Sequence, residues 1–151
     1  MNNDTFYLKG TSNTPKIDFN GATGELLLEG RSIPSNSIKV YSAAFEWISK
    51  YIENPRPTTN FRLNLEYFNT SSVIWISKII RALSNMEFPD YTLVLYIYLD
   101  LDDVIDLDPK DVVDLLAPVI DFNKVPTVNL CIKLCGIDSS GNVVKESDVL
   151  L

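Results

Sequence analysis

Strand-like and helix-like segments alternate along most of this chain, and that alternation limits the folds that the chain can adopt. The strand-like segments are short apolar or alternating runs bounded by turn residues, at 16–19, 25–29, 62–68, 91–99 and 128–134. Helical segments separate the later strands, so those strands are expected to pair in a mixed sheet with helices mostly on one face. The sequence therefore predicts an α/β fold, and its 151 residues suit a single domain spanning 1–151.

The N-terminal part predicts a β-hairpin followed by a helix. Residues 16–19 alternate between polar and apolar side chains, 20–24 form a glycine-containing turn, and 25–29 return as the second strand. Residues 37–53 then place their apolar side chains on one side at helical spacing. Two prolines at 55 and 57 end this helix.

Two further helices and a C-terminal strand pair are predicted. One helix begins near Val73 and runs to about Glu87, with an apolar face suited to packing on a sheet. Asp108 and Pro109 mark the start of another, which ends near Pro118. A turn at 138–142 follows the 128–134 strand, and 143–149 is expected to return as an edge strand.

The charge and composition exclude several classes of function. The net charge is −7 and lysine and arginine do not cluster, so nucleic-acid binding is not expected. The chain has no histidine, which removes the commonest general base and metal ligand. Gly21 and Gly24 belong to the hairpin turn rather than to a phosphate-binding loop, so we expect no cofactor and no enzymatic activity. No apolar run is long enough to insert into a membrane and no secretory signal is seen, so we expect a cytoplasmic protein.

Acidic and cysteine residues provide two weaker candidates. Asp100, Asp102 and Asp103 suggest a cation loop, but Val104 and Ile105 stand where such a loop needs a glycine, so no metal site is expected. Cys131 and Cys135 are four residues apart in a predicted strand, about 13 Å, which is too far for a disulfide. We expect both cysteines to be core or strand residues.

The motif most informative about function is the run from Tyr67 to Ser72, where the 62–68 strand gives way to a helix. Three hydroxyl residues, Thr70, Ser71 and Ser72, follow Asn69 at the expected helix start. Hydroxyl groups at such a position commonly cap the helix. A helix start also has free N–H groups and a partial positive charge, so it tolerates a phosphate. We interpret Thr70 as a phosphorylation site, with capping as the alternative.

A small docking surface is predicted beside this threonine. Ile74 falls in the polar face of the helix and lies one turn beyond Thr70, with Lys78 and Arg81 nearby. A single exposed apolar residue is common and by itself needs no function. Together with Asn69, Ser71 and Ser72, these three side chains are the residues that we expect to bind a partner.

Three sequence elements in order resemble the SiaC-type bacterial regulatory phosphoproteins. They are a glycine-led segment at 30–37, a helical segment at 45–48 that contains Trp47, and the Asn-Thr-Ser-Ser run at 69–72. The resemblance covers about residues 10–117, and the stretch at about 123–151 is longer than the family core. The predicted order of strands and helices is similar to the STAS-like fold of anti-sigma-factor antagonists, which also have a phosphorylatable hydroxyl at a strand-to-helix junction.

The resemblance also implies how such a protein works. Thr70 would be phosphorylated by a dedicated Ser/Thr kinase and dephosphorylated by a membrane-linked PPM-type phosphatase. The unphosphorylated protein would bind and activate a diguanylate cyclase, in c-di-GMP signalling of the kind that controls biofilms. The alternative is a STAS-like module that binds a protein or a small ligand without phosphorylation.

Overall fold

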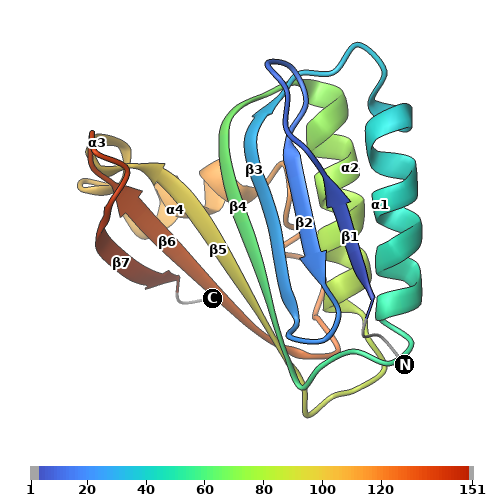
Figure 1. Cartoon of the computed structure of the whole chain (residues 1–151). Helices are drawn as coiled ribbons and strands as arrows, with labels where there is room; N and C mark the ends of the chain where they lie inside the picture. Colours follow the sequence, from blue (N-terminus) through green and yellow to red (C-terminus); the bar gives the residue numbers. More distant parts are fainter. Residues whose placement is uncertain (1–3, 150–151) are drawn as a thin grey trace.

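The computed structural model describes residues 4–149, which form one seven-stranded sheet in which neighbouring strands follow chain order. The strands are β1 (Thr5–Leu8), β2 (Lys16–Asn20), β3 (Glu25–Ser32), β4 (Thr58–Phe68), β5 (Thr92–Asp100), β6 (Asn129–Ile137) and β7 (Val143–Val149). The first three strands pair antiparallel, β3 to β6 are parallel, and β7 returns antiparallel to β6 (Figure 1). The mixed sheet and the N-terminal hairpin predicted from the sequence are therefore confirmed.

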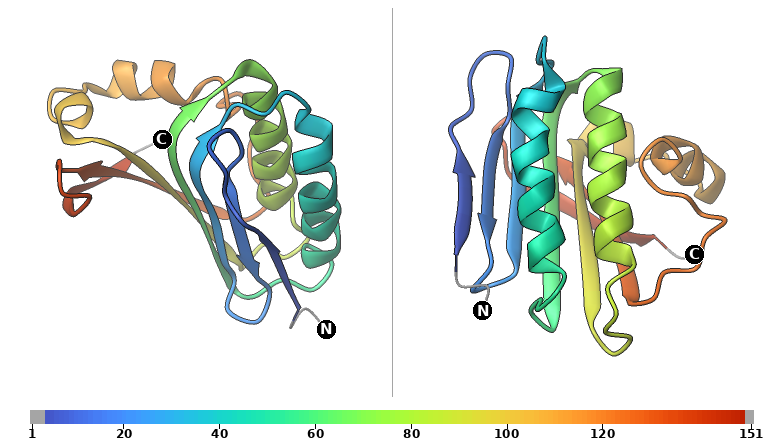
Figure 2. Two further views of the ribbon diagram at one scale, coloured as in Figure 1. Left: turned by 45° about the horizontal axis from the view of Figure 1, so that its top comes forward. Right: turned by 90° about the vertical axis from the view of Figure 1, so that its right-hand side faces the viewer.

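Helices cover one face of this sheet, as predicted. They are α1 (Ser37–Tyr51), α2 (Thr70–Ser84), the short α3 (Leu101–Val104) and α4 (Pro109–Leu116). α1 and α2 lie side by side across the N-terminal strands, whereas α3 and α4 sit beyond β5 (Figure 2). α4 lies over the same face as α2, because Leu116 of α4 and Ile76 of α2 line one cavity with the strand residues Leu63 and Ile97.

The core is a set of apolar rows that cross the sheet on its helix-covered face. One row runs through five paired strands and consists of Phe19, Leu26, Phe61, Leu95 and Ile132. Each of these side chains is at most 1% exposed. Because side chains alternate between the faces of a strand, the same registers place the intervening polar residues on the other face. The periodicity of the sequence therefore fixed which side of the sheet is covered.

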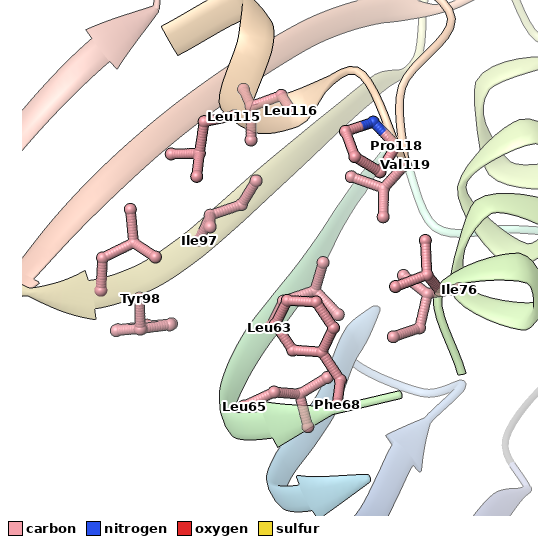
Figure 3. A pocket seen from close by; sticks show the side chains of 12 residues that line it. Leu63, Leu65, Phe68, Ile76, Ile97, Tyr98, Leu115, Leu116, Pro118 and Val119 are labelled. Atoms are coloured by element: carbon pink, nitrogen blue, oxygen red, sulfur yellow. The ribbon is translucent and has the colours of Figure 1, made fainter. Parts of the chain in front are cut away.

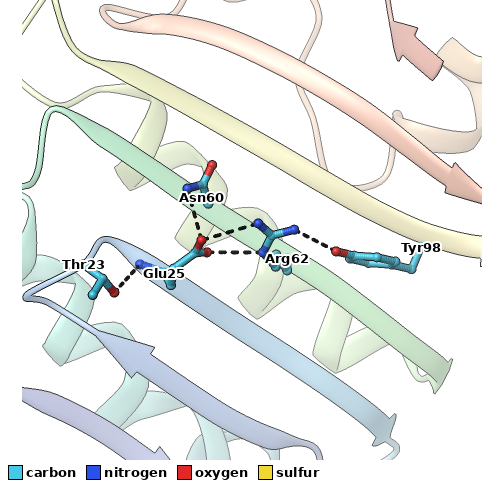
Figure 4. A network of polar contacts seen from close by, with 5 residues as sticks. All are labelled: Thr23, Glu25, Asn60, Arg62 and Tyr98. Atoms are coloured by element: carbon cyan, nitrogen blue, oxygen red, sulfur yellow. Dashed lines mark hydrogen bonds and ion pairs between the residues drawn. The ribbon is translucent and has the colours of Figure 1, made fainter. Parts of the chain in front are cut away.

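The opposite face has a polar network in place of helices. Arg62 donates from Nε to Glu25 at 3.2 Å and from Nη1 to the Tyr98 hydroxyl at 2.9 Å (Figure 4). Its guanidinium carbon also lies 4.0 Å from the centre of the Tyr96 ring. Partial burial by itself would lower the pKa of Arg62, but the hydrogen bonds to Glu25 and Tyr98 outweigh it and raise the pKa. The network ties β3, β4 and β5 together across this face.

β4 and β5 separate before either strand ends. Their paired residues stop at Leu63 and Ile97, whereas β4 continues along β3 as far as Phe68. β5 and β6 turn away from the upper part of β4 (Figure 1). The last residues of β4 therefore have a neighbouring strand, β3, on one side only. A gap lies on their other side, and side chains of α2 and α4 border it.

Several element boundaries differ from the sequence prediction. α2 begins at Thr70, three residues before the predicted Val73, and it ends at Ser84 rather than near Glu87. The cause at the start is Asn69, whose side chain caps the helix earlier than the apolar pattern suggests. The Asp100–Asp103 segment is the end of β5 and the short helix α3, rather than a loop. α4 begins as predicted, with Asp108 and Asp111 forming a capping box.

The two cysteines are unpaired and both lie in β6, with Cys131 exposed and Cys135 buried. Within residues 4–149, no group of three or more acidic, histidine or cysteine side chains is arranged to hold a metal ion. Among the residues that the structure describes, no helix is long and apolar enough to cross a membrane.

Candidate regulatory and partner-binding site

Asn69, not Thr70, caps α2. The Asn69 backbone is extended, and its Oδ1 accepts hydrogen bonds from the Ser72 N–H at 3.0 Å and from the Ser71 hydroxyl at 3.1 Å. Its Nδ2 donates to the Pro34 carbonyl at 3.3 Å, which ties the helix start to the loop after β3. Capping was the alternative explanation for Thr70, and the structure gives that role to its neighbour.

Thr70 is the first residue of α2 and its side chain is exposed. Across the part of the chain that the structure describes, no hydrogen bond or ion pair involves the Thr70 hydroxyl. The first turn of α2 also contains no acidic residue. The helix dipole and unpaired N–H groups at this end are therefore not yet balanced by a carboxylate, which leaves a favourable position for added negative charge.

Ser72 lies in a buried hydroxyl network beneath Thr70. Its side chain is 0% exposed, and Oγ is 2.7 Å from both Asn69 Oδ1 and Ser32 Oγ. The Ser32 hydroxyl is in turn 2.5 Å from the Tyr41 hydroxyl of α1. Burial raises the pKa of Tyr41, and its hydrogen bonds to Ser32 and Ser72 oppose that effect only in part.

This network corrects one prediction about Ser72. A fully buried side chain cannot touch a partner, so Ser72 anchors the start of α2 to β3 and α1 rather than binding another protein. Ser71 is half-buried and directed to Asn69, so its contribution to a surface is small. The network fixes the position from which Thr70 projects.

Two exposed apolar residues lie close to Thr70 in the chain. Ile74, one turn along α2, is 53% exposed, as the sequence predicted, and Phe68, which pairs with the buried Ser32 at the end of β4, is 56% exposed. We call these two residues with Thr70 the Thr70 patch. Tyr67 is 55% exposed but pairs with Arg31 on the other face of the sheet, where the Arg31 guanidinium lies 4.9 Å from the centre of its ring. Exposed large apolar residues that lie close together typically mark an interaction surface.

Phe68 is the site residue that sequence analysis missed. It ends a run that predicts a buried strand, and the early separation of β4 from β5 exposes it. Tyr67 directly precedes it, and a strand directs consecutive side chains to opposite faces. Because Phe68 pairs with Ser32 on the helix-covered face, Tyr67 lies with Arg31 on the face away from the core.

The predicted basic residues Lys78 and Arg81 are exposed on α2. At about 100° per residue, Thr70, Ile74 and Arg81 share one side of the helix within about 40°. The Lys78 ammonium lies 4.7 Å from the centre of the Trp75 ring, so this side chain leans toward α1. The structure therefore places Arg81 in line with Thr70 and places Lys78 at the margin of the same surface.

A groove lies next to the Thr70 patch, between α2 and α4. It contains a cavity of about 140 Å³ with an almost wholly apolar lining (Figure 3). β4 supplies Leu63, Leu65 and Phe68, and α4 with the residues after it supplies Leu115, Leu116, Pro118 and Val119. Val73 and Ile76 of α2 and Ile97, Tyr98 and Leu99 of β5 complete the wall. We call this the α2–α4 groove. Phe68 belongs both to the groove and to the Thr70 patch, so the two surfaces are continuous.

The fold and this site together describe a mixed α/β protein with a free hydroxyl at a helix start and an apolar surface beside it. A family model described as the SiaC family regulatory phosphoprotein matches residues 8–132, which is most of the chain. The chain therefore belongs to the SiaC family, and the resemblance read from its sequence is confirmed. Membership makes it a regulatory protein rather than an enzyme. The C-terminal part of β6 and all of β7 lie beyond the matched residues.

Solved structures agree with this assignment at the level of fold. The crystal structure of apo-SiaC from Pseudomonas aeruginosa superimposes with a TM-score of 0.63 at 21% identity, over 84% of this chain and 98% of that chain. SiaC in the crystal structure of the diguanylate cyclase SiaD in complex with its activator SiaC, from the same organism, gives a TM-score of 0.65 at 21% identity and the same coverage.

A curated relative covers a shorter segment. An uncharacterised protein of Pseudomonas aeruginosa strain UCBPP-PA14 is 30% identical over 67 residues, which is 44% of this chain and 53% of that protein. The matched segment thus spans about half the length of this relative. Identity at this level does not transfer the details of a site.

Proposed function

We propose that this protein is a phosphorylation-controlled activator of a diguanylate cyclase, with Thr70 as the controlled residue. The observation that supports the proposal most is the division of roles at the start of α2. Asn69 caps the helix and Ser72 anchors it, so Thr70 has an exposed hydroxyl with no structural task among the described residues. A family described as regulatory phosphoproteins is consistent with this use of the hydroxyl.

Phosphorylation at this position is expected to change the surface and leave the fold intact. A phosphate adds about −1.5 to −2 charges, which the N-terminal end of a helix accommodates. The same group is strongly hydrated and lies close to Phe68 and Ile74, which are about half exposed. A partner that packs on these apolar side chains would have to desolvate the phosphate, and binding would be lost.

The partners follow from this mechanism and from the relatives. In Pseudomonas aeruginosa, SiaC is the activator of the diguanylate cyclase SiaD in a crystallised complex. We propose a diguanylate cyclase as the partner of this chain also, bound when Thr70 is unmodified. A Ser/Thr kinase adds the phosphate and a PPM-type phosphatase removes it, both in the cytoplasm, where cyclic dinucleotide signalling takes place.

The first experiment is intact-mass and peptide mass spectrometry of the protein from its own cells under several growth conditions. A phosphate on Thr70 is the expected result. If the peptide that contains Thr70 is well covered and always unmodified, the protein is a phosphorylation-independent binding module instead.

The second experiment measures cyclic di-GMP synthesis by a diguanylate cyclase from the same genome, with and without this protein. Thr70→Ala should still activate, whereas Thr70→Asp and enzymatically phosphorylated protein should lose at least tenfold in binding, about 1.4 kcal/mol. Thr58→Asp is a matched control, since Thr58 is an exposed threonine at the opposite end of β4. Equal loss in Thr58→Asp and Thr70→Asp would show a general effect of added charge and would reject the switch.

A further inference from the structure

Ser32 joins the end of β3 to the start of α2 through both its side chain and its main chain. It is the last residue of β3 and is 0% exposed. Its hydroxyl donates to the Ser72 hydroxyl at 2.7 Å. Its carbonyl oxygen accepts from the Asn69 N–H at 2.9 Å and lies 2.8 Å from the Ser72 hydroxyl. One buried serine therefore holds two residues of the segment that contains Thr70.

These two residues enclose Thr70 in the chain. Asn69 directly precedes Thr70, and Ser72 is the second residue after it. The Thr70 side chain is exposed and makes no hydrogen bond among the described residues, so it does not fix its own position. The direction in which the Thr70 hydroxyl projects therefore depends on the neighbours that Ser32 holds.

The hydroxyl groups around Ser32 form a chain with one direction. Each hydroxyl has a single proton. Because Ser32 donates to Ser72, it must accept from the Tyr41 hydroxyl, which lies 2.5 Å away. Ser72 lies 2.7 Å from Asn69 Oδ1, the oxygen that caps α2. Ser32 is thus the middle link between α1 and the cap beside Thr70.

A second buried pair on α1 provides a comparison. The Tyr51 hydroxyl, at the other end of the helix, lies 2.7 Å from the hydroxyl of Thr59 in β4. Thr59 and Tyr51 are 0% and 1% exposed, so the two pairs are matched in burial. Within residues 4–149, no hydrogen bond links the Thr59 side chain to α2. Both pairs support α1, but only the pair at Ser32 extends to the start of α2.

We propose that Ser32 is a positioning residue for the phosphorylation of Thr70. The inference rests on the proposed function, in which a Ser/Thr kinase transfers the γ-phosphoryl group of ATP. In that step the Thr70 oxygen bonds to the γ-phosphorus, the bond from this phosphorus to the departing ADP breaks, and the hydroxyl proton is released. The attacking and leaving oxygens must be roughly in line, and a displacement of about 1 Å can cost about a hundredfold in rate.

The test compares Ser32→Ala with Thr59→Ala in the full-length chain. Each variant removes a buried hydroxyl that is bonded to a tyrosine of α1, so both should melt at similarly reduced temperatures. Each is added at a series of concentrations to a lysate of the cells that make the protein, with ATP, at a temperature where circular dichroism shows every variant folded. Peptide mass spectrometry then measures the phosphate on Thr70. The maximal rate should fall at least about fivefold for Ser32→Ala with little change in KM, and Thr59→Ala should match the unmodified chain.

Ser32→Cys serves where Ser32→Ala does not fold. A thiol fills nearly the same space but is a weak donor, so the same loss of maximal rate is expected. Amide hydrogen exchange reports the helix start directly. The N–H groups of Ser72 and Val73, which bond to Asn69 at 3.0 and 3.2 Å, should exchange faster in the Ser32 variants than in Thr59→Ala. Equal exchange in the Ser32 and Thr59 variants would overturn the inference.

The outcomes separate this inference from the function proposed above. If the unmodified chain is phosphorylated on Thr70 and the Ser32 variants match its rate, the inference fails and the switch stands. A higher rate in the Ser32 variants would mean that the kinase prefers an unwound helix start, and this too would overturn the inference. If the unmodified chain receives no phosphate on Thr70 in the lysate or in its own cells, the proposed function fails, and the inference fails with it.

Discussion

α2 and α4 begin in different ways. α2 follows β4 directly, whereas α4 follows the short helix α3 and a loop after β5. α4 starts with Asp108 as its cap, a proline at the first position and Asp111 in the first turn, and the two aspartates form a reciprocal capping box. α2 starts with the neutral cap Asn69 and has no acidic residue in its first turn. The negative charge that α4 already contains is missing from α2, where an exposed threonine occupies the first position.

The comparison shows how a helix start can be stable and still accept a modification. At α4, the carboxylates balance the helix dipole and a phosphate would meet like charge. At α2, stability comes from an uncharged network that lies behind the helix end, through Ser72, Ser32 and Tyr41. Because the network is buried and the threonine is exposed, a change at Thr70 need not disturb the network.

The largest effect is expected from breaking the buried network at α2. Ser72→Ala removes a hydroxyl that lies within hydrogen-bond distance of both Asn69 and Ser32, and it leaves their buried polar groups short of a partner. The free energy of unfolding should fall by about 2 kcal/mol. Urea denaturation measures it, and Ser71→Ala, at the half-buried neighbour, should cost less than half as much.

The caps of the two helices give the next effect. Asn69→Ala should lower the free energy of unfolding by about 1.5 kcal/mol, because three hydrogen bonds to Oδ1 and one from Nδ2 are lost. Asp108→Ala at the exposed start of α4 should cost about 1 kcal/mol. If Asp108→Ala lowers the free energy of unfolding more than Asn69→Ala does in urea denaturation, α2 does not depend on its cap more than α4 does.

The pH dependence of stability should report Tyr41. Burial raises its pKa in the folded state above the ordinary value of about 10, so folding favours the neutral phenol. This contribution is fully present below about pH 10 and is lost as the pH rises through the folded pKa. Tyr41→Phe should lower stability at neutral pH by about 1 kcal/mol and make its decline above pH 10 less steep than in the unmodified protein. Parallel curves for the two proteins would show that the Tyr41 hydroxyl does not titrate with folding.

The smallest effect is expected from adding charge at the start of α2. Thr70→Asp should raise the free energy of unfolding by about 0.5 kcal/mol, because a carboxylate in the first turn complements the helix dipole. Asp111→Asn, which removes such a carboxylate from α4, should lower it by a similar amount. Thermal melts at low salt provide the measurement. Marked destabilisation by Thr70→Asp would mean that a phosphate at this position perturbs the fold and not the surface alone.

Most of the secondary structure could be predicted from the sequence because local pattern and local chemistry determine it. Alternating apolar residues define β2, a run of three leucines defines β3, and Asp108 with Pro109 defines the start of α4, because these signals act within a few residues. The start of α2 was predicted three residues late. Four possible capping side chains follow one another there, and the choice of Asn69 depends on Ser32 and Pro34, which are distant in the sequence.

The candidate site was predicted in part. Thr70 and Ile74 are exposed as expected, since the helical period alone places them away from the apolar face. Ser72 was assigned to the partner surface and is buried, because its environment is supplied by β3 and α1. Phe68 ends a predicted buried strand and is exposed, because its burial would require β5 to follow β4 to its end. Tyr67 is exposed because it lies with Arg31 on the face that the helices leave uncovered.

By itself, the sequence determined the order of the elements, the face of the sheet that the helices cover, and the placing of a threonine at a helix start. These properties depend on side-chain periodicity and on capping chemistry, which act over a few residues. The tertiary structure decided that β4 and β5 separate after Leu63 and Ile97, and that separation exposes Phe68 and opens the α2–α4 groove. Strand separation depends on how α2 and α4 pack against different parts of the sheet, which no local pattern encodes.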